Sequence, residues 1–284
     1  RDELLKIGYD FKSKSDTEVI LHAYEEWGED CLRRFNGMWS FAILDPKKNT
    51  LFCSRDRFGV KPFYYYLDGA VFVFASEIKG LLEHPGIKAA PNDRTIFNYL
   101  ASGYGYTDIS DETSFKGIKQ LKAGHYMNIG VSGKEVSQSG YWNPLPDGKA
   151  SFKSDEDACR DFYGLFEDSV RLRLRSDVPV GVALSGGLDS SSIACVAAGL
   201  IKGTRLEAFS SCFEAEKECD ERPFIQPVLD KTQAHANFIF SKPGNFFDEI
   251  ETIIWHQDEP YSTLSIFPQW YVMKLAAQKG VKVL

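Results

Sequence analysis

Hydrophobic and polar residues form an apolar run, a polar turn and a helical pattern between Val178 and Ala198, where the chain reads VPVGVALSGGLDSSSIACVAA. The segment Val178–Leu184 is short, apolar and rich in valine, which predicts a strand buried on both faces of a parallel sheet. A tight polar turn follows, and apolar residues recur at helical spacing from Ser191 onward. The pattern therefore predicts a strand, a glycine-rich turn, and a helix that starts in or just after that turn.

The rest of the second half alternates between strand and helix. An amphipathic helix is expected at Asp157–Arg175, and its inward face is predicted to consist of Phe162, Leu165, Phe166, Val170 and Leu174. Strands are predicted at 206–213, 238–241 and 282–284, and helices at 220–232, 246–255 and 268–278. This alternation is typical of a doubly wound α/β domain, whose parallel sheet binds ligands at the carboxyl ends of its strands.

The first half is rich in strands. Two hairpins are predicted, at 38–44 with 50–54 and at 63–67 with 71–75, and two further strands at 124–129 and 135–142. Helices are expected at 76–82, at 93–102 and after the capping box Ser15–Glu18, with Gly28 as the stop of that last helix. The patterns together predict an α+β domain at 1–145, a polar linker at 146–156 and the α/β domain at 157–284.

Composition narrows the class of protein. A chain of 284 residues can bury two sizeable cores, and a content of 43% hydrophobic and 26% charged residues is that of an ordinary soluble protein. A net charge of −7 and the lack of a long apolar run give no reason to expect nucleic acid or a membrane as a partner. The six cysteines form no C-x-x-C pair, which predicts reduced thiols in a cytoplasmic protein and no metal cluster. The chain starts without methionine and ends in a strand-like segment, so we expect a piece of a longer protein.

The polar turn is the strongest candidate for chemistry. It consists of Ser185, Gly186, Gly187, Leu188, Asp189 and Ser190. A strand–turn–helix unit directs backbone N–H groups and the positive end of a helix at one point, which suits a phosphate, and the Asp189 carboxylate could hold a cation. A P-loop is excluded because no lysine follows the glycines, whereas a nucleophile elbow built on Ser185 and an ordinary capped turn are alternatives.

Longer strings are more restrictive than the turn alone. The string S-G-G-L-D-S resembles the pyrophosphate loop of ATP pyrophosphatases, which split ATP into AMP and pyrophosphate. Strings in the first half resemble the glutaminase domain of asparagine synthetases: SDTEVI at 15–20, NGMWSFA at 36–42, RDRFGVKPFYY at 55–65 and FASEIK at 74–79. The resemblance implies an α+β N-terminal-nucleophile amidohydrolase with an αββα sandwich, whose cysteine thiolate and free α-amino group release ammonia from glutamine.

The resemblance continues to the end of the chain, through GYW at 140–142, RLRSDVPVG at 173–181, DE at 220–221 and HQDEP at 256–260. It implies that the second half is an α/β doubly wound parallel sheet of the ATP pyrophosphatase type. In the family such a sheet binds ATP and activates aspartate as an acyl-adenylate.

Site residues are carried over only where this sequence matches the family. Asp16 is expected to bind the α-amino group of glutamine, and Leu184, Ser185, Gly186, Gly187, Leu188, Asp189 and Ser190 to bind ATP and pyrophosphate. Asp189 is the expected Mg²⁺ ligand, and Ser211 lies where the backbone of the second strand contacts adenine in the family. The nucleophilic cysteine is expected before Arg1 and a second acidic segment after Leu284. We therefore expect no catalytic residue within these 284 residues and no activity from them alone.

Four hypotheses follow. The first is a glutamine-hydrolysing asparagine synthase, a cytoplasmic carbon–nitrogen ligase that takes glutamine, aspartate and ATP with Mg²⁺ and is compatible with a homodimer. The second is an amide or lactam synthetase or a peptide cyclase of the same architecture that uses ATP without glutamine. The third is a serine hydrolase with Ser185 as nucleophile, Asp220 as acid and His235 or His256 as base. The fourth is a degenerate, inactive partner subunit.

Overall fold

The computed structural model describes residues 1–69, 71–102, 110–133, 135–145, 148, 152–213, 220–240 and 246–284. The chain divides into two compact units. Unit 1 is Arg1–Gly148 together with Asp258–Pro260, and unit 2 is Lys149–Gln257 together with Tyr261–Leu284. The domain boundaries expected from the sequence remain a prediction, and residues 146, 147 and 149–151 of the expected linker lie outside the described residues.

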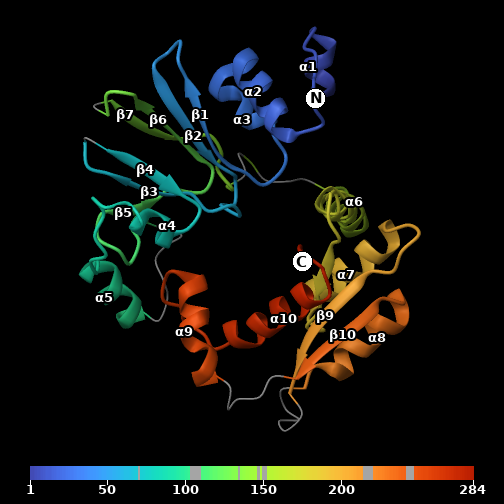
Figure 1. Cartoon of the computed structure of the whole chain (residues 1–284). Coiled ribbons are helices and arrows are strands. Elements are labelled where there is room, and N and C mark those ends of the chain that lie inside the picture. Colours follow the sequence, from blue (N-terminus) through green and yellow to red (C-terminus); the bar gives the residue numbers. More distant parts are fainter. Residues whose placement is uncertain are drawn as a thin grey trace. The chain divides into compact units, whose positions relative to one another are not determined.

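Unit 1 contains two antiparallel sheets with short helices on them (Figure 1). Its helices are α1 (Asp2–Lys6), α2 (Asp16–Trp27), η1 (Gly28–Asp30), α3 (Cys31–Arg34), α4 (Ile78–Leu82) and α5 (Asp93–Ser102). One sheet has the order β1-β2-β6-β7 and the other the order β4-β3-β5. The strands are β1 (Ser40–Asp45), β2 (Thr50–Arg55), β3 (Tyr64–Leu67), β4 (Phe72–Ala75), β5 (Ile118–Gln120), β6 (His125–Gly130) and β7 (Val136–Gly140).

Both predicted hairpins are confirmed. The first pairs β1 with β2, with Ala42 opposite Cys53, and the second pairs β3 with β4, with Tyr65 opposite Phe74. The short strand β5 was not predicted, because only Ile118–Gln120 form it and they pair with the far side of β3.

The packing of side chains shows how the layers of unit 1 are arranged. Neighbouring residues of β2 point to opposite faces, so Phe52 packs with Leu4 and Leu32 of α1 and α3, and Cys53 packs with Tyr65 of the second sheet. The outer face of the second sheet is covered by Ile78 and Leu81 of α4, which pack with Ile118 and with partly buried residues of β3 and β4. Unit 1 is thus layered helix, sheet, sheet, helix.

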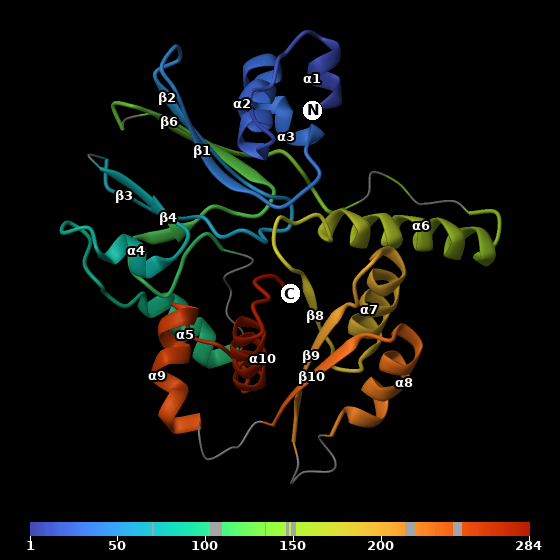
Figure 2. The same ribbon diagram turned by 45° about the vertical axis from the view of Figure 1, so that its right-hand side comes forward.

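Unit 2 is built on a parallel sheet of order β10-β9-β8. Its elements are α6 (Asp155–Arg173), β8 (Gly181–Ala183), α7 (Leu188–Leu200), β9 (Glu207–Cys212), α8 (Arg222–Thr232), β10 (His235–Phe240), α9 (Phe246–Gln257) and α10 (Ile266–Gln278). Helices α7 and α8 lie on one face of the sheet and α10 on the other (Figure 2). The core therefore buries both faces of β9: Ala208 packs with α7 and α8, and Phe209 with α10.

Several element boundaries differ from the sequence prediction. Strand β8 is only Gly181–Ala183 instead of Val178–Leu184, and α7 begins within the turn at Leu188. Strand β10 starts at His235 instead of Phe238, because it pairs with β9 from Glu207 onward. The predicted final strand forms one parallel bridge, in which Gly181 N–H donates to the Val283 carbonyl oxygen at 2.8 Å.

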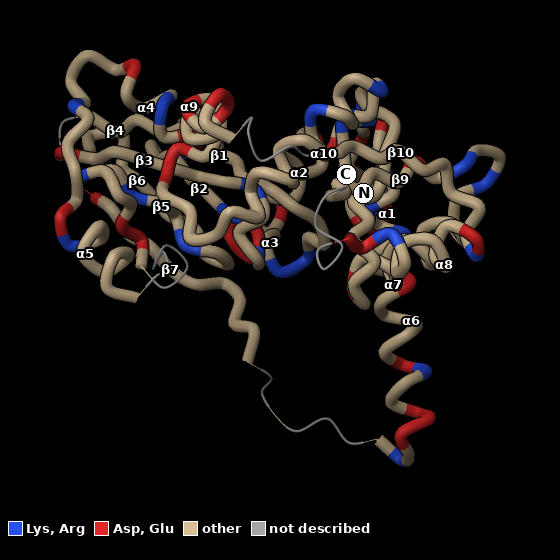
Figure 3. The backbone as a smooth tube through the Cα atoms, turned by 90° about the horizontal axis from the view of Figure 1, so that it is seen from below, with Lys and Arg blue, Asp and Glu red and all other residues tan. Residues whose placement is uncertain are grey.

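The predicted inward face of α6 is wrong for its first half. Phe162 and Leu165 are exposed to 69% and 73%, whereas Val170 is buried against the sheet and α7. Among the described elements, only the end of α6 packs into this core, which leaves the earlier apolar residues in solvent. Acidic and basic residues recur along the whole of the helix (Figure 3), and two ion pairs lie on its surface, Arg160 with Asp157 and Arg171 with Asp168.

Residues Asp258–Pro260 belong to unit 1 although the chain on either side of them is counted with unit 2. Helix α4 has no side-chain cap from its own N-cap residue, and the Asp258 carboxylate accepts the N–H of Ile78 at 2.7 Å instead. The other oxygen of Asp258 pairs with Lys79 at 3.0 Å, with only 9% and 19% of the two side chains exposed. Glu259 accepts the N–H of Ser114 at 2.8 Å, and burial raises the pKa of its carboxyl. A helix of unit 1 is therefore capped by a residue 180 positions further along the chain.

We predict that Asp258→Ala exposes the start of α4. The change removes the helix cap and one partner of Lys79, and it puts alanine at a left-handed φ of +61°. Loss of such a cap should lower the local stability of α4 by about 1–2 kcal/mol, measured as faster amide hydrogen exchange at Ile78–Leu82. Asp258→Asn is the matched control, because asparagine tolerates this φ and keeps an oxygen for Ile78. Equal protection of α4 in wild type and Asp258→Ala would contradict the prediction.

Candidate functional site

The predicted phosphate turn lies at the carboxyl end of β8 and is held by the neighbouring strand. Leu184, which is buried, donates its N–H to the Phe209 carbonyl oxygen at 2.9 Å, and its own carbonyl accepts the Ser210 hydroxyl at 2.6 Å. A Cβ on Gly181 would lie 2.8 Å from the Phe209 ring, so β8 approaches β9 as only glycine allows. These contacts fix the position from which the turn departs.

The turn itself requires glycine at Gly186. Its φ is +75°, and a Cβ there would lie 2.7 Å from Phe224 Cβ and 3.1 Å from the Ile225 nitrogen at the start of α8. The next glycine, Gly187, is the N-cap of α7 and supplies no side-chain acceptor for the first turn of that helix. No side chain in the described part of the chain caps the N-terminal N–H groups of α7, and such uncapped groups are suited to binding an anion.

Two serines of the turn contact each other. Their hydroxyl oxygens, Ser185 Oγ and Ser190 Oγ, lie 3.1 Å apart, and the Ser190 hydroxyl also contacts the Gly187 carbonyl oxygen at 3.2 Å. Leu188 and Asp189 follow in the first turn of α7, and both side chains are exposed. The structure brings all seven predicted ATP-binding residues from Leu184 to Ser190 into one continuous turn.

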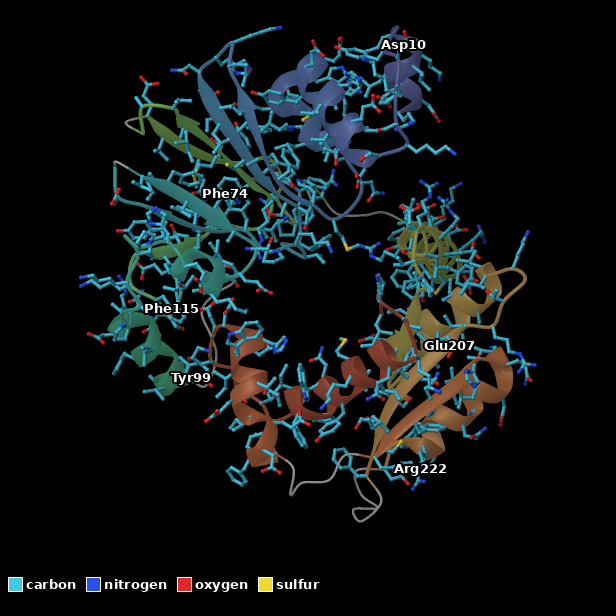
Figure 4. All side chains as sticks on the ribbon, viewed as in Figure 1. Asp10, Phe74, Tyr99, Phe115, Glu207 and Arg222 are labelled. Carbon is cyan, nitrogen blue, oxygen red and sulfur yellow. The ribbon has the colours of Figure 1, made fainter. Side chains whose placement is uncertain are left out.

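The eighth predicted residue, Ser211, is level with this turn. Ala183 is opposite Phe209 in the parallel register, and Ser211 follows two residues further along β9, toward the end of the sheet from which the turn departs. Arg222 opens α8 at the same end of the sheet, where its guanidinium lies 5.6 Å from the centre of the Phe240 ring at the end of β10. Figure 4 labels Arg222 at this end and Glu207 toward the opposite end of β9.

Asp189 supplies a carboxylate at the turn that a cation could use. The described residues contain no group of three or more His, Cys, Asp or Glu side chains that could hold a metal by themselves. Mg²⁺ in nucleotide sites is commonly held by one or two carboxylates, with phosphate oxygens and water completing its shell. The Asp189 carboxylate, in the first turn of α7, fits that donor set.

The residues required for a serine hydrolase are not assembled in the described structure. Asp220 is engaged by the guanidinium of Arg222 at 2.8 Å, which lowers the pKa of its carboxyl. His235 contacts Glu207 at 2.9 Å at the opposite end of β9, and the Nδ1 atom of His256 lies 2.8 Å from the Thr252 carbonyl oxygen. Neither histidine contacts Ser185, so the arrangement does not favour a nucleophilic serine.

In unit 1, Asp16 lies at the first position of α2. The Ser15 hydroxyl accepts the N–H of Thr17 at 3.1 Å, as expected for an N-cap. The capping box itself is wrong in detail, since Glu18 does not bond to Ser15. Its carboxylate accepts the N–H groups of Lys12 and Ser13, both at 2.7 Å, because the preceding loop folds back onto the helix. Hydrogen bonds, led by that from the Ser13 hydroxyl, lower the pKa of Glu18 to about 2.

A pocket of about 360 Å³ opens beside Asp16. Four segments of the chain line it. They are Asp16, Thr17, Ile20 and Leu21 of α2; Met38, Trp39, Ser40, Phe41, Ala42 and Ile43; Lys61 and Pro62; and Ser76. The Asp16 side chain is exposed and forms no ion pair with a cation in the described part of the chain. Sequence reasoning noted these strings separately but did not predict that they meet around Asp16.

Three of the described cysteines are unsuited to nucleophilic chemistry. Burial raises the pKa of the Cys31 and Cys53 thiols to about 12, and burial also raises the pKa of Cys212. A cysteine nucleophile reacts as the thiolate, which these thiols do not form near neutral pH. The five described cysteines are all free, and Cys219 lies outside the described residues. No helix in the described part of the chain is both long and apolar enough to span a bilayer.

Comparison with known proteins assigns each half of the chain. Residues 1–142 match the glutamine amidotransferase domain family, and residues 161–284 match the asparagine synthase family. The putative asparagine synthetase [glutamine-hydrolyzing] 2 of Methanocaldococcus jannaschii is 38% identical over 95% of this chain and 52% of its own length. The asparagine synthetase [glutamine-hydrolyzing] 3 of Bacillus subtilis is 44% identical over 92% of this chain and 43% of its own length. The chain spans about half the length of these curated relatives. With a glutamine amidotransferase domain followed by an asparagine synthase domain, it belongs to the family of glutamine-hydrolysing asparagine synthetases.

Proposed function

We propose that the whole protein converts aspartate to asparagine with ATP, using ammonia that it releases from glutamine. The turn from Leu184 to Ser190 carries the proposal, because it combines a glycine-dependent anion site with a carboxylate at the carboxyl end of a parallel strand. The names of the relatives support the choice of substrates. We assign unit 1 to the N-terminal-nucleophile amidohydrolase fold, as its helix, sheet, sheet, helix layering suggests, and unit 2 to the ATP pyrophosphatase fold.

The chemistry explains why ATP is needed. A carboxylate is a poor acyl donor, and its adenylation provides a leaving group that ammonia can displace. Charge that develops on the departing pyrophosphate would be stabilised by the uncapped N–H groups of α7 and the hydroxyls of Ser185 and Ser190. Ser211 would place its backbone beside the adenine ring.

Mg²⁺ is part of the proposal, with Asp189 as its protein ligand. When bound, the ion would neutralise phosphate charge beside the turn. The Asp189 side chain is on the exposed first turn of α7, where a phosphate-bound ion could reach it.

Asp16 is the proposed contact for the α-ammonium group of glutamine. It contributes a carboxylate, without an ion-pair partner among the described residues, to a pocket that is otherwise lined by mostly apolar side chains and Lys61. We expect the nucleophilic cysteine of the whole protein to precede Arg1. A cytoplasmic location fits the free cysteines, and a homodimer is compatible with the proposal.

Asp16→Asn in the whole protein should raise KM for glutamine by about tenfold or more and leave ammonia-dependent synthesis unchanged. The reason is the loss of a charge-assisted hydrogen bond to an ammonium group, typically worth about 1.5–3 kcal/mol. Asparagine production would be measured with each nitrogen source. Asp10→Asn, which changes a carboxylate outside the pocket lining, is the control. If asparagine production fell equally with glutamine and with ammonia, Asp16 would only stabilise the N-terminus of α2, and the assignment would be wrong.

Asp189→Asn should abolish ATP-dependent synthesis with either nitrogen source and preserve glutamine hydrolysis. The amide is nearly isosteric, so folding should survive, but it is a poor Mg²⁺ ligand. Pyrophosphate release and glutaminase activity would be assayed on the same preparation. The control is Asp177→Asn, an exposed carboxylate ahead of β8. Normal pyrophosphate release by Asp189→Asn would refute the assignment.

Ser185→Ala should reduce adenylation by about tenfold and not eliminate it, because the hydroxyl is one donor among several N–H groups at the turn. For a hydrolase, loss of the nucleophile would instead remove almost all activity. Pyrophosphate release and ester hydrolysis would be compared between wild type and variant. Ester hydrolysis that depends on Ser185, in a wild type that does not use ATP, would overturn the proposed function.

A further inference from the structure

Asp56 is a buried carboxylate that no part of the proposed chemistry uses. Asp56 lies in the loop that follows β2, and only 1% of the residue's surface is exposed. A charge in such a place is costly unless it is fully hydrogen-bonded. The hydrogen-bond partners of Asp56 therefore indicate the structural role of its carboxylate.

The two carboxylate oxygens of Asp56 divide their partners. Oδ1 accepts the N–H groups of Phe58 at 3.1 Å and Val60 at 3.0 Å, which closes the loop on itself. Oδ2 accepts the N–H groups of Lys61 at 2.9 Å and Trp39 at 3.3 Å. The second oxygen thus joins two segments that are separate in the sequence.

The backbone of Asp56 strengthens the same junction. Its N–H donates to the Trp39 carbonyl oxygen at 2.9 Å, so Trp39 is bound through both its N–H and its carbonyl. Its carbonyl accepts the N–H groups of Gly59 at 3.1 Å and Gly124 at 2.8 Å. Both segments joined by Asp56, at Trp39 and at Lys61, line the pocket beside Asp16, whereas Asp56 itself does not line it.

We propose that Asp56 is a positioning residue for the glutamine pocket: its carboxylate sets the distance between the Trp39 and Lys61 walls that face Asp16. The inference rests on the proposed function, which makes this pocket the glutamine site. A pocket whose walls are held at a fixed distance from the Asp16 carboxylate would hold the α-amino group and the side-chain amide of glutamine at a defined separation. A change in Asp56 would therefore act on glutamine binding from outside the pocket.

Asp56→Asn is the direct test. Asparagine offers one acceptor oxygen, so in either orientation two of the four N–H groups would face an NH₂ group. In the whole protein we expect KM for glutamine to rise about tenfold, with kcat for glutamine less affected and ammonia-dependent synthesis unchanged. We also expect faster hydrogen exchange at the amides of Trp39 and Lys61.

Asp45→Asn is the matched control. Asp45 also accepts two backbone N–H groups, those of Lys47 and Lys48 at 3.0 Å and 3.1 Å, but at the β1–β2 turn outside the pocket lining. It should lower thermal stability and leave KM for glutamine as in wild type. Equal KM values in Asp56→Asn and Asp45→Asn, or parallel losses with glutamine and ammonia, would overturn the positioning role.

Gly59→Ala keeps the test decisive if Asp56→Asn does not fold. Gly59 has a φ of +63°, and a Cβ there would lie 3.0 Å from the Arg55 guanidinium, so alanine strains the same loop without touching the carboxylate. The same selective rise in KM for glutamine is expected, and an unchanged KM would count against the inference. A wild-type whole protein that makes asparagine from ammonia but does not hydrolyse glutamine would instead reject the glutamine half of the proposed function, and the inference with it.

Discussion

The candidate sites of this protein depend on backbone N–H groups that are not bonded within a helix or a sheet, and on which acceptors these groups have. Such groups are costly when they are buried without a partner. In unit 1 carboxylates supply the acceptors: Asp56 takes four N–H groups, and Asp258 takes that of Ile78. In unit 2 no described side chain caps the first turn of α7. The first arrangement fixes the shape of the backbone, and the second leaves donors available for a ligand.

The open donors of unit 2 are useful only because the turn that presents them is rigid. Leu184 is fixed to β9 through its N–H and its carbonyl, and the start of α8 fills the space where a side chain on Gly186 would stand. The turn is therefore held by β9 before it and by α8 beside it. Donors held in this way need little reorganisation when charge develops on a bound phosphate, which is the main advantage of a preorganised site.

Features set by neighbouring residues could be predicted from the sequence, and features set by distant ones could not. The two hairpins and the turn from Ser185 to Ser190 are local, and their residue patterns predicted them. The exposure of Phe162 and the strand β5 depend on what packs or pairs from elsewhere. Asp258 caps a helix 180 positions away, and no local pattern at His256–Pro260 indicates that partner. For Asp56 the signal was present, an acid between two arginines ahead of Gly59, but its bond to Trp39 was not foreseeable.

The two oxygens of Asp56 show how a local and a distant constraint meet in one side chain. Oδ1 bonds within five residues and can close its loop from local sequence alone, whereas Oδ2 reaches Trp39, 17 positions earlier. A neutral acceptor with one oxygen could satisfy either set but not both. The ionised carboxylate is the smallest group that accepts all of these N–H groups at once, since it has two oxygens and no donor of its own. Burying this charge costs free energy, and its four hydrogen bonds offset that cost. The carboxylate thereby joins the loop to a wall of the pocket.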